Sequence, residues 1–226
     1  MVCWNWKADG FALLLISGMF IAGAALLPHL PERVPVHWDI HGQPDRYGSP
    51  WEATFAIPGL AALIFALMHL LPRIDPRSAN YARFAGVYTL FRLAIVVFLS
   101  AMQGVILANA MGVGVRVAQV VMIAVGVLFV LLGNCLGKVQ PNWFVGIRTP
   151  WTLTSTRSWR KTHRLGGYLF VASGLLFIAC AFVGDGLAGA ILPLAFLGMS
   201  TLWLVVYSYL VWRADPERET ASGRAA

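Results

Sequence analysis

The chain has 226 residues, of which 58% are hydrophobic and 12% are charged, and its mean hydropathy is +0.70. A soluble domain carries about 25% charged residues, so this composition excludes a soluble globular protein and indicates an integral membrane protein. The net charge of +7 does not predict direct nucleic-acid binding, because the basic residues gather in short segments between apolar runs.

Six apolar runs predict an all-α membrane protein, a six-helix transmembrane bundle, because a spanning helix needs about 20 mostly apolar residues. The first run is short and contains Ala22-Gly23-Ala24-Ala25, which resembles a signal-peptidase site, so cleavage of this helix stays open. The runs are 11–27, 53–71, 84–108, 117–136, 165–183 and 187–212. The predicted parts are an N-terminal helix pair with an outer loop, a four-helix membrane domain and a disordered cytoplasmic tail, at 1–83, 84–212 and 213–226.

The distribution of Lys and Arg predicts the orientation of the bundle. If every run crosses the membrane, thirteen of the 17 Lys and Arg residues lie on one side and three on the other, and Arg92 lies within the third run. The more basic side faces the cytoplasm, so both termini are predicted to be cytoplasmic. The three residues on the outer side are Arg33, Arg46 and Arg116.

The segment at 28–51 is too polar to span a membrane and is rich in Pro and Gly, which predicts one ordered outer loop with turns at Gly42 and around Pro44. In an extended chain, alternate side chains share a face, which would bring His37, Asp39 and His41 together as a weak candidate zinc site. The alternative is that these residues cap turns and bond loop carbonyls. No sequence motif predicts a cofactor or a catalytic residue.

Two polar residues lie within predicted spans, Arg92 in the third and Asn134 in the fourth. A charge at mid-bilayer costs at least ~2.5 kcal/mol, so Arg92 must face protein or water. We favour a side chain that snorkels toward the cytoplasmic surface. The other interpretation is a polar partner within reach, and the candidates are Gln103, Asn134 and Asp185.

The segment at 141–167 is basic, contains no acidic residue, and has three tryptophans at intervals of eight residues. It predicts a basic amphipathic inner loop with a short interfacial helix at 152–164, capped by Thr154 or Ser155. This loop either anchors the protein to anionic lipid or forms a docking surface for a cytoplasmic partner.

Three segments resemble the SdpI family of bacterial membrane proteins. The segment at 30–49, LPERVPVHWDIHGQPDRYGS, resembles a domain of unknown function that precedes the SdpI domain. The segment at 74–84, IDPRSANYARF, resembles the linker that follows that domain. The segment at 142–167, NWFVGIRTPWTLTSTRSWRKTHRLGG, resembles the motif of the SdpI domain. The resemblance implies a multi-pass protein of the bacterial cytoplasmic membrane, related to an immunity protein against a secreted toxin. In the founding system, that immunity protein also receives the toxin signal and recruits a cytoplasmic autorepressor.

The resemblance also implies candidate site residues. On the outer side it implies a ligand site at Pro35, His37, Gly42 and Asp45, which Asp39 joins by its position in the loop. His41 departs from the family pattern, which weakens the zinc hypothesis. On the inner side it implies a partner-binding set, which Arg160 joins from the same basic segment. The matching residues of this set are Gly146, Arg148, Thr149, Pro150, Trp151, Trp159, Thr162 and His163.

Three functional hypotheses follow. The first is immunity to a secreted antimicrobial peptide that meets the outer face, with signal transduction through a cytoplasmic transcriptional regulator held at the inner face. The alternative is a small membrane enzyme or transporter that uses His37, Asp39, His41 and Arg92. The third is an envelope scaffold without a ligand. We favour the first, which predicts the lipid bilayer as a partner, no enzymatic activity and no cofactor.

Overall fold

The structure is a computed structural model that describes residues 5–183 and 187–217. In these ranges, six helices are long and apolar enough to cross a membrane, which confirms the predicted six-helix bundle. The interval at 184–186 between the last two predicted spans and most of the predicted disordered tail lie outside the described residues. The six helices are α1 (Trp6–Leu26), α2 (Pro50–Ile74), α3 (Ala85–Ala110), α4 (Val117–Leu136), α6 (Thr156–Cys180) and α7 (Leu187–Arg213).

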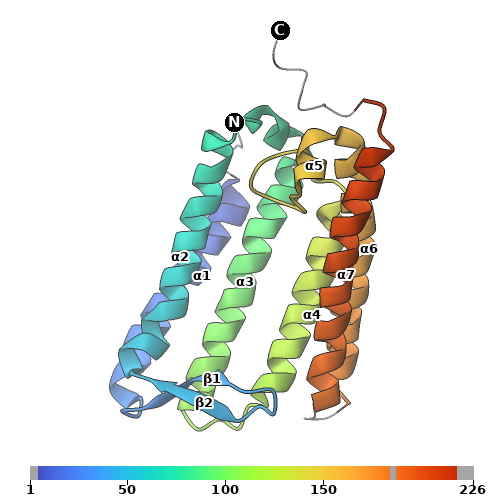
Figure 1. The fold of residues 1–226 in the computed structure, drawn as a ribbon. Coiled ribbons are helices and arrows are strands. Elements are labelled where there is room, and N and C mark those ends of the chain that lie inside the picture. Colours follow the sequence, from blue (N-terminus) through green and yellow to red (C-terminus); the bar gives the residue numbers. More distant parts are fainter. Residues whose placement is uncertain (1–4, 184–186, 218–226) are drawn as a thin grey trace.

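Helix α3 stands between two groups of helices (Figure 1). It packs against α1 and α2 on one side and against α4 on the other, while α4 packs against α6 and α6 packs against α7. The start of α1 and the end of α7 lie at the same end of the bundle, as the predicted location of both termini requires. This end, called the inner end below, also holds the short helices η2 (Ser78–Phe84) and α5 (Pro150–Thr154). The predicted domain division at 83/84 stays a prediction.

The predicted ordered loop at the outer end contains the short helix η1 (Leu27–His29) and a β-hairpin that the sequence analysis did not predict. The hairpin joins the antiparallel strands β1 (Val34–Trp38) and β2 (Pro44–Gly48). Gly42 lies in the turn with a φ of 75°, as expected. The expected turn at Pro44 is wrong, because Pro44 pairs with Trp38 across the hairpin.

The hairpin crosses the outer ends of three helices. Strand β1 packs against α2 and α3, and Val34 is fully buried. At the tip of the hairpin, a Cβ atom placed on Gly42 would lie 3.3 Å from the Cβ of Ala118 in the first turn of α4. The hairpin therefore connects the α1–α2 group with α4 at the outer end.

Helices α4 and α6 approach each other through glycines. A Cβ atom placed on Gly133 would lie 2.8 Å from the carbonyl oxygen of Gly167, and one placed on Gly167 would lie 2.7 Å from the carbonyl oxygen of Gly133. In the same way, a Cβ atom placed on Gly126 would lie 2.6 Å from the carbonyl oxygen of Gly174, and one placed on Gly174 would lie 2.5 Å from that of Gly126. Small residues let two membrane helices pack backbone against backbone, so these four positions fix the α4–α6 pair.

The predicted interfacial helix at 152–164 is wrong as a separate element. Helix α5 ends at Thr154, and α6 begins at Thr156 and continues into the membrane. Ser155 caps α6, as one of the two expected caps, by accepting a hydrogen bond from the backbone nitrogen of Ser158 at 2.9 Å. On the first turns of α6, Ser158, Thr162 and His163 are buried in the protein, whereas the basic residues of the same turns are exposed.

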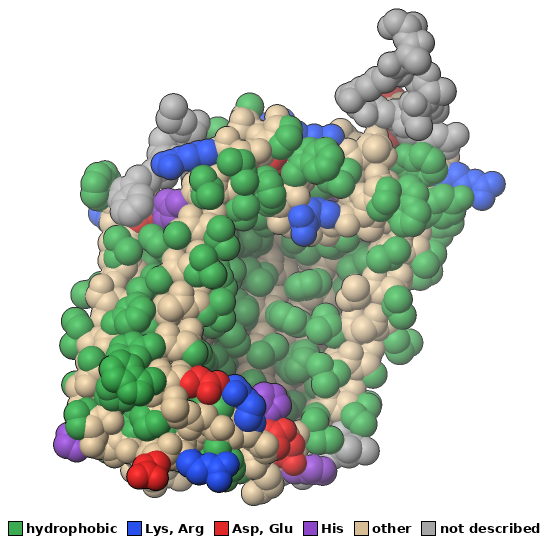
Figure 2. Space-filling model, turned by 60° about the vertical axis from the view of Figure 1, so that its left-hand side comes forward, with side chains coloured by type: hydrophobic (Ala, Val, Ile, Leu, Met, Phe, Trp, Pro, Cys, Tyr) green, Lys and Arg blue, Asp and Glu red, His purple; other side chains and the backbone are tan. Residues whose placement is uncertain are grey.

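One flank of the bundle is hollowed between the α1–α2 side and the α7 side (Figure 2). Hydrophobic side chains line this lateral hollow, and charged and histidine side chains gather at its lower rim, at the hairpin end of the bundle. In a bilayer, the hollow opens sideways toward the lipid.

Candidate functional site: the inner cap

The inner cap consists of residues 75–84, residues 139–155 and the first two turns of α6. Its centre is Asp75, which is 3% exposed at the end of α2. The carboxylate of Asp75 accepts hydrogen bonds from the Tyr81 hydroxyl at 2.9 Å and from the backbone nitrogens of Arg77 and Trp143 at 2.7 and 2.9 Å. Three donors satisfy a carboxylate that burial would otherwise penalise. Asp75 thereby joins the linker after α2 to the loop before α5.

Asn142 and two linker side chains complete this junction. The side-chain oxygen of Asn142 accepts from the backbone nitrogens of Phe144 and Val145 at 2.9 and 2.6 Å, so this buried side chain shapes the loop. From the linker, the Asn80 amide donates to the Pro141 carbonyl at 2.7 Å, and Arg77 donates to the Leu153 carbonyl at 2.8 Å. These bonds join segments 61 and 76 residues apart, so the cap is a tertiary structure rather than a free loop.

His163 and Gly146 depend on each other. The His163 ring is fully buried, and its Nδ1 lies 2.9 Å from the Trp159 carbonyl oxygen, which can only accept. Nδ1 therefore carries the proton, and Nε2 accepts from the backbone nitrogen of Ile147 at 2.9 Å. Gly146 has a φ of 116°, and a Cβ atom there would lie 2.3 Å from His163 Nε2. Only glycine fits this position while the ring holds the loop.

Trp159 lies inside the protein rather than at the membrane surface. It is fully buried, its indole nitrogen donates to the Val139 carbonyl at 2.8 Å, and its ring stacks on that of His163 with 4.0 Å between the centroids. Thr162 is also fully buried. The expectation that regular tryptophan spacing marks a lipid-facing surface is therefore wrong for Trp159, although Trp143 is 46% exposed.

The motif residues Thr149 and Pro150 start helix α5. Thr149 and Thr152 form a capping box, with hydrogen bonds of 3.2 and 2.9 Å between side chain and backbone in each direction, and proline occupies the first helical turn. The Thr149 hydroxyl also lies 2.9 Å from the Ser208 hydroxyl of α7. Near the end of α7, Ser155 donates to the carboxylate of Asp215. The cap thus holds α7 as well as α2.

The nine predicted partner-binding residues have two structural roles. Thr149, Trp159, Thr162 and His163 are buried and build the cap. The others are exposed or half-buried and lie on its surface. Arg148 is held there by donating to the Trp143 carbonyl at 2.7 Å, and the Trp151 ring packs against Tyr209 of α7. The surface residues of the set are Gly146, Arg148, Pro150, Trp151 and Arg160.

The outer hairpin does not assemble the predicted zinc ligands. The chain leaves the extended conformation after Trp38, and Asp39 accepts from the backbone nitrogens of His41 and Gln43 at 2.9 and 2.8 Å. Among the described residues, no group of three His, Cys, Asp or Glu side chains could hold a metal ion. The turn-capping alternative is correct for Asp39. Instead, Nδ1 of His37 lies 2.6 Å from a carboxylate oxygen of Asp45. Beside this pair, the Arg46 guanidinium lies 2.7 Å from a carboxylate oxygen of Glu52.

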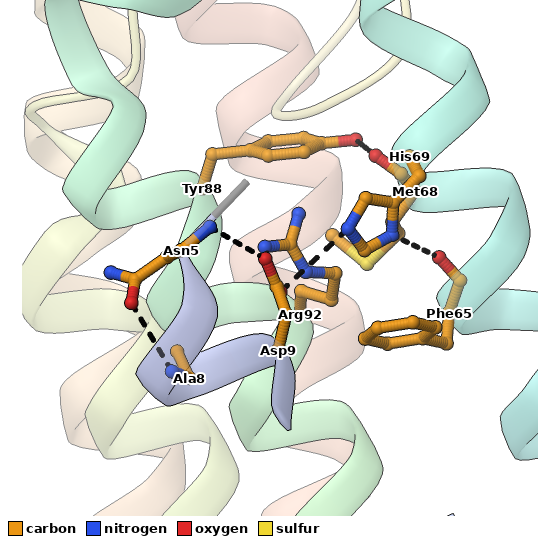
Figure 3. A network of polar contacts seen from close by, with 8 residues as sticks. All are labelled: Asn5, Ala8, Asp9, Phe65, Met68, His69, Tyr88 and Arg92. Atoms are coloured by element: carbon orange, nitrogen blue, oxygen red, sulfur yellow. Dashed lines mark hydrogen bonds and ion pairs between the residues drawn. The ribbon is translucent and has the colours of Figure 1, made fainter. Parts of the chain in front are cut away.

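Arg92 has a partner that the sequence analysis did not consider. Its guanidinium is 2% exposed and is bound to the carboxylate of Asp9 in α1, so the snorkelling interpretation is wrong (Figure 3). Asp9 also accepts from the backbone nitrogen of Asn5 at 2.7 Å, and His69 Nε2 lies 3.7 Å from its carboxylate. The Cζ atom of the Arg92 guanidinium lies 5.8 Å from the centroid of the Phe65 ring. One ion pair thus joins α1 and α3 at the inner end, and His69 brings α2 to it.

Two of the three partners proposed for Arg92 form their hydrogen bonds elsewhere in the structure. Gln103 donates to the carbonyls of Ala53 and Thr54 at 3.1 and 3.2 Å near the outer end. Asn134 donates to the Val130 carbonyl on its own helix at 2.8 Å. Asp185 lies outside the described residues.

Comparison with known proteins matches most of the inner cap to a protein family. Residues 138–209 match the SdpI/YfhL protein family, and residues 14–62 match a domain of unknown function named DUF1648. The chain carries an SdpI/YfhL-family domain. The immunity protein SdpI of Bacillus subtilis (strain 168) is 24% identical over 204 residues, which cover 90% of this chain and 96% of that protein. No solved structure matches the chain.

The SdpI domain supplies most of the inner cap and the helices that carry it. It begins at Lys138, includes α5 and α6, and ends within α7, whereas the DUF1648 region contains most of α1, the hairpin and the first half of α2. Asp75 and Asn80 lie between the two matched regions and bind the SdpI domain to the end of α2. The predicted family resemblance is confirmed in both regions. The chain is a multi-pass membrane protein by its six candidate spans and its similarity to SdpI.

Proposed function

We propose that this protein gives a bacterial cell immunity to a secreted, membrane-active peptide from within the cytoplasmic membrane. The observation that carries the proposal is similarity to the immunity protein SdpI over 90% of the chain and 96% of the relative. Similarity over nearly the whole length includes the hairpin, the spans and the inner cap, and not the motif alone.

The lateral hollow is the proposed binding site for the peptide. A membrane-active peptide partitions into the bilayer, and a hollow that opens sideways and is lined by hydrophobic side chains can take it up without passage through water (Figure 2). Because lipid tails are as apolar as the hollow, van der Waals packing and polar contacts, rather than the hydrophobic effect, would hold the peptide there.

The hairpin is the proposed first contact for the peptide on the outer side. His37 and Asp45 form an exposed pair, with side chains 64% and 45% exposed, and Asp39 and Gly42 shape the turn beside it. Pro35 lies in the first strand of the hairpin, paired with Tyr47. Exposed groups of both signs here suit the polar face of an amphipathic peptide.

Signal transduction through a cytoplasmic regulator is the second part of the proposal. The basic surface of the inner cap, with Arg148, Trp151 and Arg160, would bind the regulator. The cap is bonded to the end of α2 and to α7, which border the lateral hollow. A peptide that changes the separation of these helices would change the cap, provided that it binds the two states with different affinity.

A killing assay tests the immunity proposal. The chain is expressed in a sensitive bacterium that lacks an immunity gene, and growth is measured against a panel of membrane-active bacterial peptides. The expected result is protection against at least one peptide, and weaker protection by the double variant His37→Gln/Asp45→Asn at equal membrane levels. Glu32→Gln, an exposed carboxylate outside the hairpin, is the matched control. Unchanged sensitivity to the whole panel would contradict the proposal.

A pull-down tests the regulator proposal separately. Wild-type protein and the Arg148→Ala/Arg160→Ala variant are purified from detergent-solubilised membranes, with and without the protective peptide. A cytoplasmic DNA-binding protein that co-purifies with the wild type only when peptide is present, and not with the variant, is the expected result. Equal recovery from both would exclude this surface as the docking site.

A further inference from the structure

A second hollow lies on the face that α4 and α6 share, at the inner end. Three glycines at the helix contact leave space where other residues would have side chains, and polar groups from both helices surround that space. Its polar lining and its position near the inner cap distinguish it from the hydrophobic lateral hollow. The lining residues are Gly133, Asn134, Gly137, Arg164, Gly167, Tyr168 and Val171.

Arg164 is the chemically distinctive group of this hollow. It is exposed, and it takes part in none of the four ion pairs found among the described residues. No acidic residue occurs between Asp75 and Asp185 in the sequence, so neither α4 nor α6 offers Arg164 a carboxylate. Tyr168, 64% exposed on the next turn of α6, adds a hydroxyl. A guanidinium without a carboxylate and a nearby hydroxyl suit a phosphate group.

The hollow lies at the depth of the cytoplasmic lipid headgroups. Helix α6 has 25 residues and a length of about 37 Å, which exceeds the ~30 Å hydrocarbon core, so its polar first turns stand outside the core. A Cβ atom placed on Gly137, just after the end of α4, would lie 3.6 Å from the Cα of Arg164. Arg164 is therefore level with the end of a spanning helix, while Val171 lies about 10 Å deeper toward the hydrocarbon.

We propose that this hollow binds one anionic phospholipid of the cytoplasmic leaflet. Arg164 pairs with the headgroup phosphate, the Tyr168 hydroxyl donates a hydrogen bond to it, and an acyl chain runs over the glycine contact toward Val171. Lys138, Arg160 and Lys161 raise the local positive potential, which favours an anionic headgroup over a zwitterionic one. The site does not depend on the proposed immunity function.

Lipid titration of the full-length protein tests this site. Delipidated protein in detergent is titrated with phosphatidylglycerol, with phosphatidylcholine and with inorganic phosphate, and bound lipid is counted by native mass spectrometry. The expected result is one tightly retained phosphatidylglycerol per chain, with affinity about fivefold lower for Arg164→Gln, since one interfacial basic residue contributes about that factor. Arg160→Gln removes the same charge one turn earlier on α6, does not line the hollow, and should lower the affinity less than Arg164→Gln does.

Each other outcome overturns the proposal. Equal losses in Arg164→Gln and Arg160→Gln would mean a diffuse basic surface without a site. Equal retention of phosphatidylcholine would show that the site does not select lipids by headgroup charge. Competition by inorganic phosphate at comparable concentration would identify a soluble phosphate site instead of a lipid site. The helical circular-dichroism spectrum of each variant shows whether it is folded, and Tyr168→Phe repeats the test with a minimal change of shape.

Discussion

Replacement of Asp9 by Asn tests whether the buried ion pair holds α1 in the bundle. The Asp9→Asn variant leaves the Arg92 guanidinium, 2% exposed, without its carboxylate. Loss of one partner of a buried pair costs about 3–5 kcal/mol because the other charge stays buried and unpaired. The neighbouring His69 offers no replacement, since it is neutral or positively charged. We expect the free energy of unfolding to fall by about 3 kcal/mol, the lower end of that range, because the amide oxygen of the substituted side chain can still accept a hydrogen bond from the guanidinium.

A double-mutant cycle in sodium dodecyl sulfate measures this effect. Arg92→Gln alone leaves the carboxylate unpaired, and Asp9→Asn/Arg92→Gln removes both charges, so the double variant should be more stable than the sum of the two losses predicts, by about 2 kcal/mol. Lys7→Gln changes an exposed charge on the same helix and should alter stability by less than about 0.5 kcal/mol. An Asp9→Asn protein as stable as the Lys7→Gln control would refute the reasoning.

Three further predictions concern packing and the inner cap. Gly146→Ala should destabilise the protein by at least about 1–2 kcal/mol in the same detergent unfolding assay, because of its positive φ and the clash with His163, and an unfolding curve like that of the wild type would contradict this. Gly167→Ala should cost about 1–3 kcal/mol by pushing α6 from the α4 backbone. Gly59→Ala, with nothing within 4 Å of the added Cβ, is its control and should be neutral or slightly stabilising. Tyr81→Phe should cost about 1 kcal/mol by removing one donor from Asp75, measured by thermal unfolding in detergent, and no loss would show that this bond is not needed.

The apolar runs were sufficient to predict the membrane helices, because span length is set by the bilayer. The β-hairpin was not predicted, because its strand sequences VPVHW and PDRYG do not alternate between polar and apolar residues as a half-buried strand would. Their pairing is fixed by the Asp39 turn and by burial of Val34 against the helices.

The partner of Arg92 was missed for a physical reason. A buried guanidinium requires a partner, which the sequence indicated, but Asp9 lies 83 residues away and before the first apolar run. Helix α1 begins at Trp6, five residues earlier than that run, and this extension brings Asp9 into the bundle. An acidic residue two positions before an apolar run, in a chain with a single intramembrane cation, is the signal that could have identified the pair.

The candidate site was predicted as a set of residues but not as a structure. Family resemblance selected the SdpI motif, yet the sequence did not distinguish its buried residues from its exposed ones. Trp159 is buried in one core cluster with Tyr81, Phe84 and Tyr88, which come from the distant linker after α2 and from α3. Pattern analysis of one segment does not contain that information.

Direct binding of the protective peptide to the purified protein in lipid nanodiscs is the most direct test of the central claim. The peptide identified in the killing assay is labelled and titrated against nanodiscs with and without the protein. Our account predicts saturable binding of a fixed number of peptides per chain, above the partitioning into protein-free nanodiscs. Equal uptake by both kinds of nanodisc, from a protein that still protects cells, would contradict the claim that the bundle protects by holding the peptide.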